Sequence, residues 1–161
     1  MIVVIMGVSG AGKTTVGHLL ANELGWEFHD GDELHSPENK RKMSEGIALN
    51  DTDRQPWLAS IRDLIEKISA RGSNAVIACS ALKQSYRDVI AGDHSRVKIV
   101  YLKGNRELIA QRIAHRTNHF MNKGLLESQF DVLEEPHDAI TVDISATPES
   151  IVETVRERLA L

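Results

Sequence analysis

The chain has 161 residues, of which 42% are hydrophobic and 26% are charged. This length fits one domain with a single core, and the composition is that of an ordinary soluble globular protein. The formal net charge is −4 without blocks of like charge, so we expect no nucleic-acid partner, which would require a basic face. A single cysteine, no apolar run of membrane-spanning length and no room for a leader before residue 2 predict a cytoplasmic protein with no membrane partner.

The first predicted element is an apolar strand, residues 2–6, followed directly by a G-x-x-x-x-G-K-T motif at residues 7–14. This order predicts a phosphate-binding loop that leads into a helix beginning at Lys13. The backbone N–H groups of such a loop bind nucleotide phosphates, Lys13 reaches the terminal phosphates, and the Thr14 hydroxyl binds Mg²⁺. The predicted nucleotide-binding residues here are Gly7, Ser9, Gly10, Ala11, Gly12, Lys13, Thr14 and Thr15.

The rest of the chain alternates between apolar strands and helices with apolar residues on one face. Asp51 is the predicted N-cap of the longest helix, and Pro148 opens the last one. This alternation predicts an α/β fold of three layers, α/β/α, in which a five-stranded parallel sheet binds ligands at the carboxyl ends of its strands. No linker or repeat divides the chain, so residues 1–161 form one predicted domain. The further predicted strands are residues 26–30, 75–79, 97–102 and 139–143.

The second predicted strand ends in His-Asp-Gly-Asp, which places Asp30 and Asp32 beside the terminal phosphate. One carboxylate can hold Mg²⁺ through water, and the other can accept a proton from a substrate hydroxyl. We assign Asp30 to the metal and Asp32 to the hydroxyl, although the spacing also allows the reverse. A GTPase is excluded because Leu125 stands where the guanine-binding aspartate of the N-K-x-D motif would have to be.

Three blocks of the sequence resemble the gluconate kinase signature: residues 28–58, residues 78–83, and residues 119–121 with 125–130. The resemblance extends over nearly the whole chain. It implies an ATP- and Mg²⁺-dependent, usually homodimeric enzyme with the nucleoside-monophosphate-kinase fold, which phosphorylates the 6-hydroxyl of D-gluconate. It also implies a substrate-binding insert at about 31–56 and a lid at about 114–130. Asn122 and Lys123 replace the prolines usual in the family, which puts the stiffness of the lid in doubt.

The resemblance implies a pocket for an anionic polyol. Arg54 is the leading candidate for the gluconate carboxylate, because a guanidinium binds a carboxylate with two hydrogen bonds. An ion pair with Asp51 or Asp53 is the alternative for Arg54, and simple solvation is the alternative for the lysines. The predicted substrate-binding residues are Asp32, His35, Lys42, Arg54, Ser80, Lys83 and Gln129.

Two arginines are predicted to bind nucleotide phosphates from the lid side of the cleft. Arg112 and Arg116 are four residues apart and share a helix face. In the resembled fold such arginines clamp the phosphates when the lid closes; the alternative is a pair of exposed arginines near Glu107. By fold analogy, adenine lies between Arg112 and the loop at 145–148, which includes Thr147. Lys13, Asp32 and Arg116 are the predicted catalytic residues.

Two other functions compete with gluconate phosphorylation. A shikimate or nucleoside-monophosphate kinase would share the phosphate-binding loop, but shikimate kinases have a run of glycines where this chain has Ser80-Ala81-Leu82. A non-catalytic ATP-binding regulator would bind ATP without turnover that depends on a sugar acid.

Overall fold

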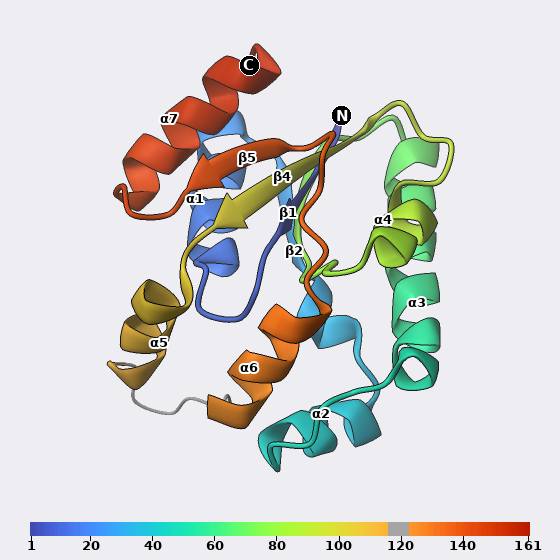
Figure 1. Ribbon diagram of the computed structural model, residues 1–161. Coiled ribbons are helices and arrows are strands. Elements are labelled where there is room, and N and C mark those ends of the chain that lie inside the picture. Colours follow the sequence, from blue (N-terminus) through green and yellow to red (C-terminus); the bar gives the residue numbers. More distant parts are fainter. Residues whose placement is uncertain (116–122) are drawn as a thin grey trace.

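A computed structural model describes residues 1–115 and 123–161. Five parallel strands form one sheet in the order β2-β3-β1-β4-β5 (Figure 1). Helices cover both faces of this sheet, so the predicted three-layer α/β/α fold is confirmed. The strands are β1 (Ile2–Met6), β2 (Glu27–Asp30), β3 (Ala75–Ala78), β4 (Val97–Lys103) and β5 (Ile140–Asp143).

The central strand β1 is fully buried because helices pack on both of its faces. Side chains alternate across a strand, so an unbroken apolar run is needed where neither face meets water. Val3 and Ile5 belong to the core beneath α1 (Lys13–Leu24) and α7 (Pro148–Leu159), whereas Val4 packs in the core beneath α3 (Asp51–Ala70) and α4 (Gln84–Ala91). Figure 1 shows these two helix pairs on opposite sides of the sheet.

The remaining helices lie beyond the carboxyl ends of the strands, at the lower end of Figure 1. This is the end of a parallel α/β sheet at which ligands bind. The predicted insert at 31–56 contains η1, α2 and the start of α3. Residues 116–122, the centre of the predicted lid, lie outside the described residues. The elements at this end are η1 (Gly31–Leu34), α2 (Pro37–Ser44), α5 (Arg106–Ala114) and α6 (Lys123–Val132).

The start of α3 differs from the prediction by one residue. Asn50, not Asp51, is the N-cap: its side-chain oxygen accepts a hydrogen bond from the Asp53 backbone N–H at 2.7 Å. The Asp53 carboxylate in turn accepts from the Asn50 N–H at 3.1 Å, which completes a capping box. Asp51 therefore keeps its carboxylate available for side-chain contacts.

Trp57, on the next turns of α3, is a core residue. Its side chain is 2% exposed, and its indole N–H donates to the Gly31 carbonyl at 2.8 Å. This bond ties α3 to the short segment between Asp30 and Asp32. None of the helices within residues 1–115 and 123–161 is long and apolar enough to cross a membrane.

Candidate functional site

The N-terminus of α1 has no capping side chain and no acidic residue in its first turn. Its N-cap, Gly12, has a φ of +94°, a left-handed conformation that favours glycine. The first N–H groups of a helix have no partner within the helix, and together with the helix dipole they attract an anion. The predicted phosphate-binding loop thus has the geometry that its motif requires.

A cavity of about 110 Å³ lies at this helix end. The ammonium group of Lys13, which is 9% exposed, donates to the Val8 carbonyl of the loop at 3.1 Å. Both predicted carboxylates, Asp30 and Asp32, line the same cavity. Gly7 instead packs beside β4, where an added Cβ would lie 3.0 Å from the Leu102 carbonyl oxygen. The cavity is lined by Ser9, Gly10, Gly12, Lys13, Thr14, Thr15, Asp30, Asp32 and Ala78.

The two carboxylates differ in their surroundings. The Asp30 side chain accepts a hydrogen bond from the Asp32 backbone N–H at 3.0 Å. Burial raises the pKa of Asp30 above its ordinary value, against the lowering effect of this hydrogen bond. Asp32 also lines a second pocket, together with Ser9, Lys13 and Arg54. Asp32 is therefore at the boundary between two pockets, and Asp30 is not.

The residues around Thr14 suit a magnesium ion that is held mainly by phosphates and water. Within the described part of the chain, no group of three His, Cys, Asp or Glu side chains could hold a metal by itself. Mg²⁺ in kinases typically keeps several waters and takes one or two protein ligands besides the substrate phosphates. A hydroxyl at Thr14 and a carboxylate at Asp30 in one small cavity match that donor set.

A larger cavity of about 420 Å³ continues from the loop toward α5 and α7. Arg112 lines it and donates a hydrogen bond to the Ile144 carbonyl, just before the loop at 145–148. Ala11 and Thr15 line it as well, which joins it to the phosphate cavity. The cavity thus lies where the adenine was predicted, between Arg112 and the loop after β5. Its other lining residues are Gly10, Gly12, Val16, Leu108, Gln111, His115, Ala146, Pro148 and Ile151.

Thr147, predicted to bind nucleotide from the loop after β5, does not line this cavity. Thr147 is the N-cap of α7, and its hydroxyl accepts from the Ser150 N–H at 3.2 Å. Its neighbours Ala146 and Pro148 line the cavity instead. Arg116, predicted to be catalytic, lies outside the described residues.

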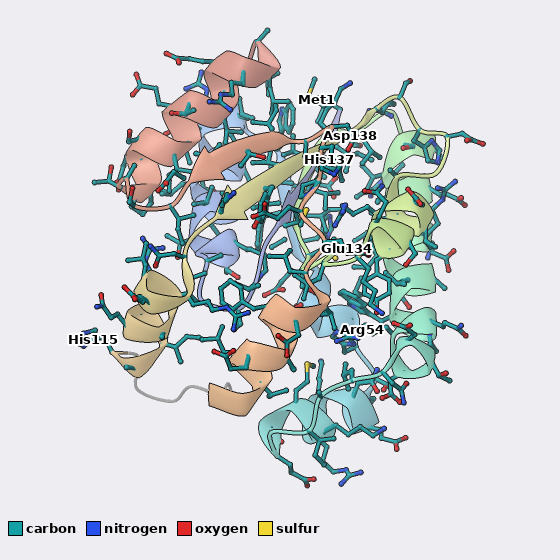
Figure 2. The ribbon with its side chains drawn as sticks, in the orientation of Figure 1. Met1, Arg54, His115, Glu134, His137 and Asp138 are labelled. Atoms are coloured by element: carbon teal, nitrogen blue, oxygen red, sulfur yellow. The ribbon has the colours of Figure 1, made fainter. Side chains whose placement is uncertain are left out.

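The second pocket lies between the phosphate-binding loop, α3 and α6. Of the seven predicted substrate-binding residues it brings together Asp32, His35, Arg54, Ser80 and Gln129. Gln129 also accepts a hydrogen bond from the Ser9 backbone N–H at 2.7 Å, so α6 contacts the loop directly. In Figure 2, Arg54 lies on the side of the molecule opposite His115 of the nucleotide cavity.

His35 is a neutral hydrogen-bonding group in this second pocket. It is 7% exposed and stacks on Trp57, with ring centroids 4.3 Å apart. Burial, followed by the nearby Arg54 charge, lowers its pKa to about 4. Its Nδ1 atom is buried, with no hydrogen-bond partner among the described residues. An uncharged imidazole of this kind can bind a hydroxyl group but cannot neutralise a carboxylate.

The charged residues near Arg54 pair with one another. Lys42 forms an ion pair with Asp53 at 3.0 Å, and Lys83 forms one with Asp51 at 2.9 Å. Neither lysine lines the pocket. The alternative expected for Arg54, an ion pair with Asp51 or Asp53, is not formed in the described structure, because the lysines occupy both carboxylates.

The comparisons with known proteins agree with this geometry. A family model for shikimate kinase matches residues 9–160. A probable gluconokinase of Dictyostelium discoideum is 45% identical, over 96% of this chain and 84% of the relative. The solved gluconokinase of Sinorhizobium meliloti 1021 is 44% identical with a TM-score of 0.88, covering 98% of this chain and 90% of that one. An unliganded sugar kinase of Janibacter sp. HTCC2649 is 42% identical with a TM-score of 0.92, over 99% and 94%.

This chain belongs to the gluconokinase family. It is therefore a kinase with a nucleotide-binding P-loop fold, as the sequence predicts. Gluconokinases and shikimate kinases share this fold, which explains why the shikimate kinase model also matches.

Sequence reasoning missed several residues of this gluconokinase-family site. Leu108, Gln111 and His115 line the nucleotide cavity from α5, at the helical spacing that places them on the Arg112 face. That spacing could have identified them. The second pocket, called the acceptor pocket from here on, is also lined by Leu125 and Ser128 of α6 and by Met43 and Leu49, which reach it through tertiary packing alone.

Gly31, between the two carboxylates, provides a test of their placement. A Cβ there would lie 2.6 Å from the Ala78 carbonyl oxygen and 2.9 Å from Ile61 Cδ1. We expect Gly31→Ala to lower the free energy of unfolding by about 1–3 kcal/mol and to reduce turnover at least about tenfold, since Asp30 and Asp32 must shift. Urea unfolding and a coupled ADP-release assay measure the two effects.

Gly25→Ala is the matched control. Gly25 ends α1 with a φ of +65° and has no atom within 4 Å of an added Cβ, so its strain should cost about 1 kcal/mol and leave turnover intact. Wild-type turnover in Gly31→Ala would contradict the inferred constraint.

Proposed function

We propose that this chain transfers the terminal phosphoryl group of ATP to the 6-hydroxyl of D-gluconate, giving 6-phospho-D-gluconate and ADP. The observation that carries this proposal is that Asp32 lines both the phosphate cavity and a pocket containing Arg54. That pocket combines a cation, a neutral histidine and other polar groups, which is the set of partners that an anionic polyol requires. The gluconokinase relatives, similar over most of both chains, support the same substrate.

Phosphoryl transfer depends on positioning and on neutralising the charge of the phosphates. The loop N–H groups and Lys13 would bind the terminal phosphates. Asp32 would orient the 6-hydroxyl and accept its proton while the hydroxyl oxygen bonds to the γ-phosphorus. The bond from that phosphorus to the β,γ-bridging oxygen breaks, and ADP carries the electron pair away. The proton on Asp32 would then pass to water.

Mg²⁺ would be held by the Thr14 hydroxyl directly and by Asp30 through water. When bound, it neutralises charge on the β- and γ-phosphates. Arg112 would contact the nucleotide from α5, and Arg116 remains a prediction for the same task. Thr147 would contribute only through the position of its loop, because its hydroxyl caps α7.

The gluconate carboxylate would bind Arg54, and its hydroxyls would bind His35, Ser80 and Gln129. Lys42 and Lys83, predicted as further contacts, would act at a distance because each already has a carboxylate partner. The homodimer and the cytoplasmic location stay predictions, which light scattering and cell fractionation would test.

A substrate panel tests the proposed reaction. With saturating MgATP, we expect ADP release with D-gluconate and none above background with shikimate or AMP. Mass spectrometry should find the product to be heavier than gluconate by one phosphoryl group. Turnover with shikimate alone would favour the second candidate, to which the family model points. ATP binding without turnover on any sugar acid would indicate a regulator.

Asp32→Asn tests the base. We expect turnover to fall by about 10²- to 10⁴-fold, since the amide cannot accept the proton, while ATP affinity stays within about twofold. Glu33→Gln is the control, because it removes the next carboxylate in the chain, which lines neither of the two pockets. A turnover near that of the wild type in Asp32→Asn would remove Asp32 from this role.

Arg54→Met tests the carboxylate contact. Losing a charge-assisted contact should raise the KM for gluconate by about 10- to 100-fold and leave the KM for ATP unchanged. Arg41→Met is a matched control: it removes an arginine of the same insert that pairs with Glu45 and does not line the pocket, and we expect a less than threefold change in the KM for gluconate. Equal effects of the two variants on the KM for gluconate would show that Arg54 does not bind the substrate carboxylate.

A further inference from the structure

Four residues at the junction of α3 and α4 form a hydrogen-bonded cluster that reaches the acceptor pocket. The Tyr86 hydroxyl is bonded to the Asp51 carboxylate, and Arg54 Nη1 lies 3.2 Å from the same hydroxyl oxygen. Lys83 Nζ donates to Asp51 at 2.9 Å. The ring of Tyr86 is 5% exposed and lies beneath Arg54, whose guanidinium carbon is 5.6 Å from the ring centroid. Of these residues, only Arg54 lines the pocket.

The direction of the hydrogen bonds in this cluster is determined by the groups themselves. A guanidinium has donors only, and an ionised carboxylate has acceptors only. The one hydroxyl proton of Tyr86 therefore goes to Asp51, and the hydroxyl oxygen accepts from Arg54. The Tyr86 hydroxyl thus donates one hydrogen bond and accepts another. It holds the Arg54 guanidinium on one side, and the other N–H groups of the guanidinium stay available for a ligand.

The same arrangement leaves the Arg54 charge available. A carboxylate in direct contact would orient Arg54 equally well but would also neutralise it. Here both nearby carboxylates, Asp51 and Asp53, pair with lysines, and a neutral hydroxyl contacts the arginine. Within the described residues, Arg54 has no ion pair. An arginine that is held in place yet keeps its charge is preorganised for an anionic ligand, because less side-chain entropy is lost on binding.

We propose that Tyr86 is a positioning residue for gluconate binding: its hydroxyl holds Arg54 in the orientation that receives the substrate carboxylate. The inference rests on the proposed function, since it requires a carboxylate-bearing substrate in this pocket. In this proposal Tyr86 contacts neither ATP nor gluconate and acts only through Arg54.

Tyr86→Phe tests this inference, because it removes the hydroxyl and keeps the buried ring. We expect the KM for gluconate to rise about tenfold, with kcat and the KM for ATP within twofold of the wild type. In an Arg54→Met background the same change should alter kcat/KM for gluconate less than twofold, because Tyr86 then has nothing to position. A purely structural role would instead give additive losses and would affect ATP as well.

Tyr101→Phe is the matched control. Tyr101 is 3% exposed, and its hydroxyl donates to Glu135 at 3.2 Å, outside the pocket. Both kinetic constants for gluconate should be unchanged in this variant. The inference is overturned if Tyr86→Phe leaves the KM for gluconate within twofold, raises the KM for ATP in parallel, or keeps its penalty in the Arg54→Met background. An absence of gluconate turnover in the wild type would reject the proposed function instead.

Discussion

The uncapped N-terminus of α1 is the feature on which the rest of the site depends. The helices α2, α3, α5 and α7 begin at a Ser, Asn, Asn or Thr whose side chain accepts a backbone N–H. At α4, the Glu134 carboxylate accepts from the Gln84 N–H. At α1, a glycine precedes Lys13 and leaves the helix end without such a side chain. A side-chain cap there would compete with phosphate for the same donors, so the site requires this helix to begin without one.

The parallel sheet places side chains of both charge signs at that helix end. β1 leads into the loop that contains Lys13, and β2, two positions away in the sheet, leads into Asp30 and Asp32. Neither carboxylate lines the nucleotide cavity, and Asp32 also lines the pocket that contains Arg54. In the proposed reaction the triphosphate would approach Lys13 and the sugar acid would approach Arg54. Asp32 lines both pockets, as that transfer requires.

How far the sequence could predict the structure depended on how local each signal was. The unbroken apolar run of β1 and the glycines of the loop are local, and parallel topology then brings the ends of β1 and β2 together. That reasoning correctly placed Lys13, Asp30 and Asp32 in one cavity. The sequence predicts Asp51 as the cap of α3, but Asn50 is an equally good capping residue, and the reciprocal bond with Asp53 selects Asn50.

Pairings between side chains of different helices had no local signal. The pairing of Lys42 with Asp53 depends on how α2 lies against the start of α3. The pairing of Lys83 with Asp51 and the position of Tyr86 beneath Arg54 depend on how α4 packs on α3. Thr147 is a different case, because its contact is local. A threonine directly before Pro148 is a typical N-cap, and its hydroxyl accepts from the Ser150 N–H three residues further on.

The wall of the acceptor pocket is also connected to the nucleotide side. Gln129 of α6 accepts from the Ser9 N–H of the loop, a donor in the phosphate cavity. Beyond α6, Arg87 donates to the carbonyls of Leu82 and Glu134, which fastens the chain after α6 to the segment that carries Ser80. Helix α6 therefore contacts the phosphate-binding loop through Gln129, and Arg87 anchors the chain that follows this helix. Ser9 and Gln129 both line the acceptor pocket, so this one hydrogen bond joins the phosphate-binding loop to the α6 wall of that pocket.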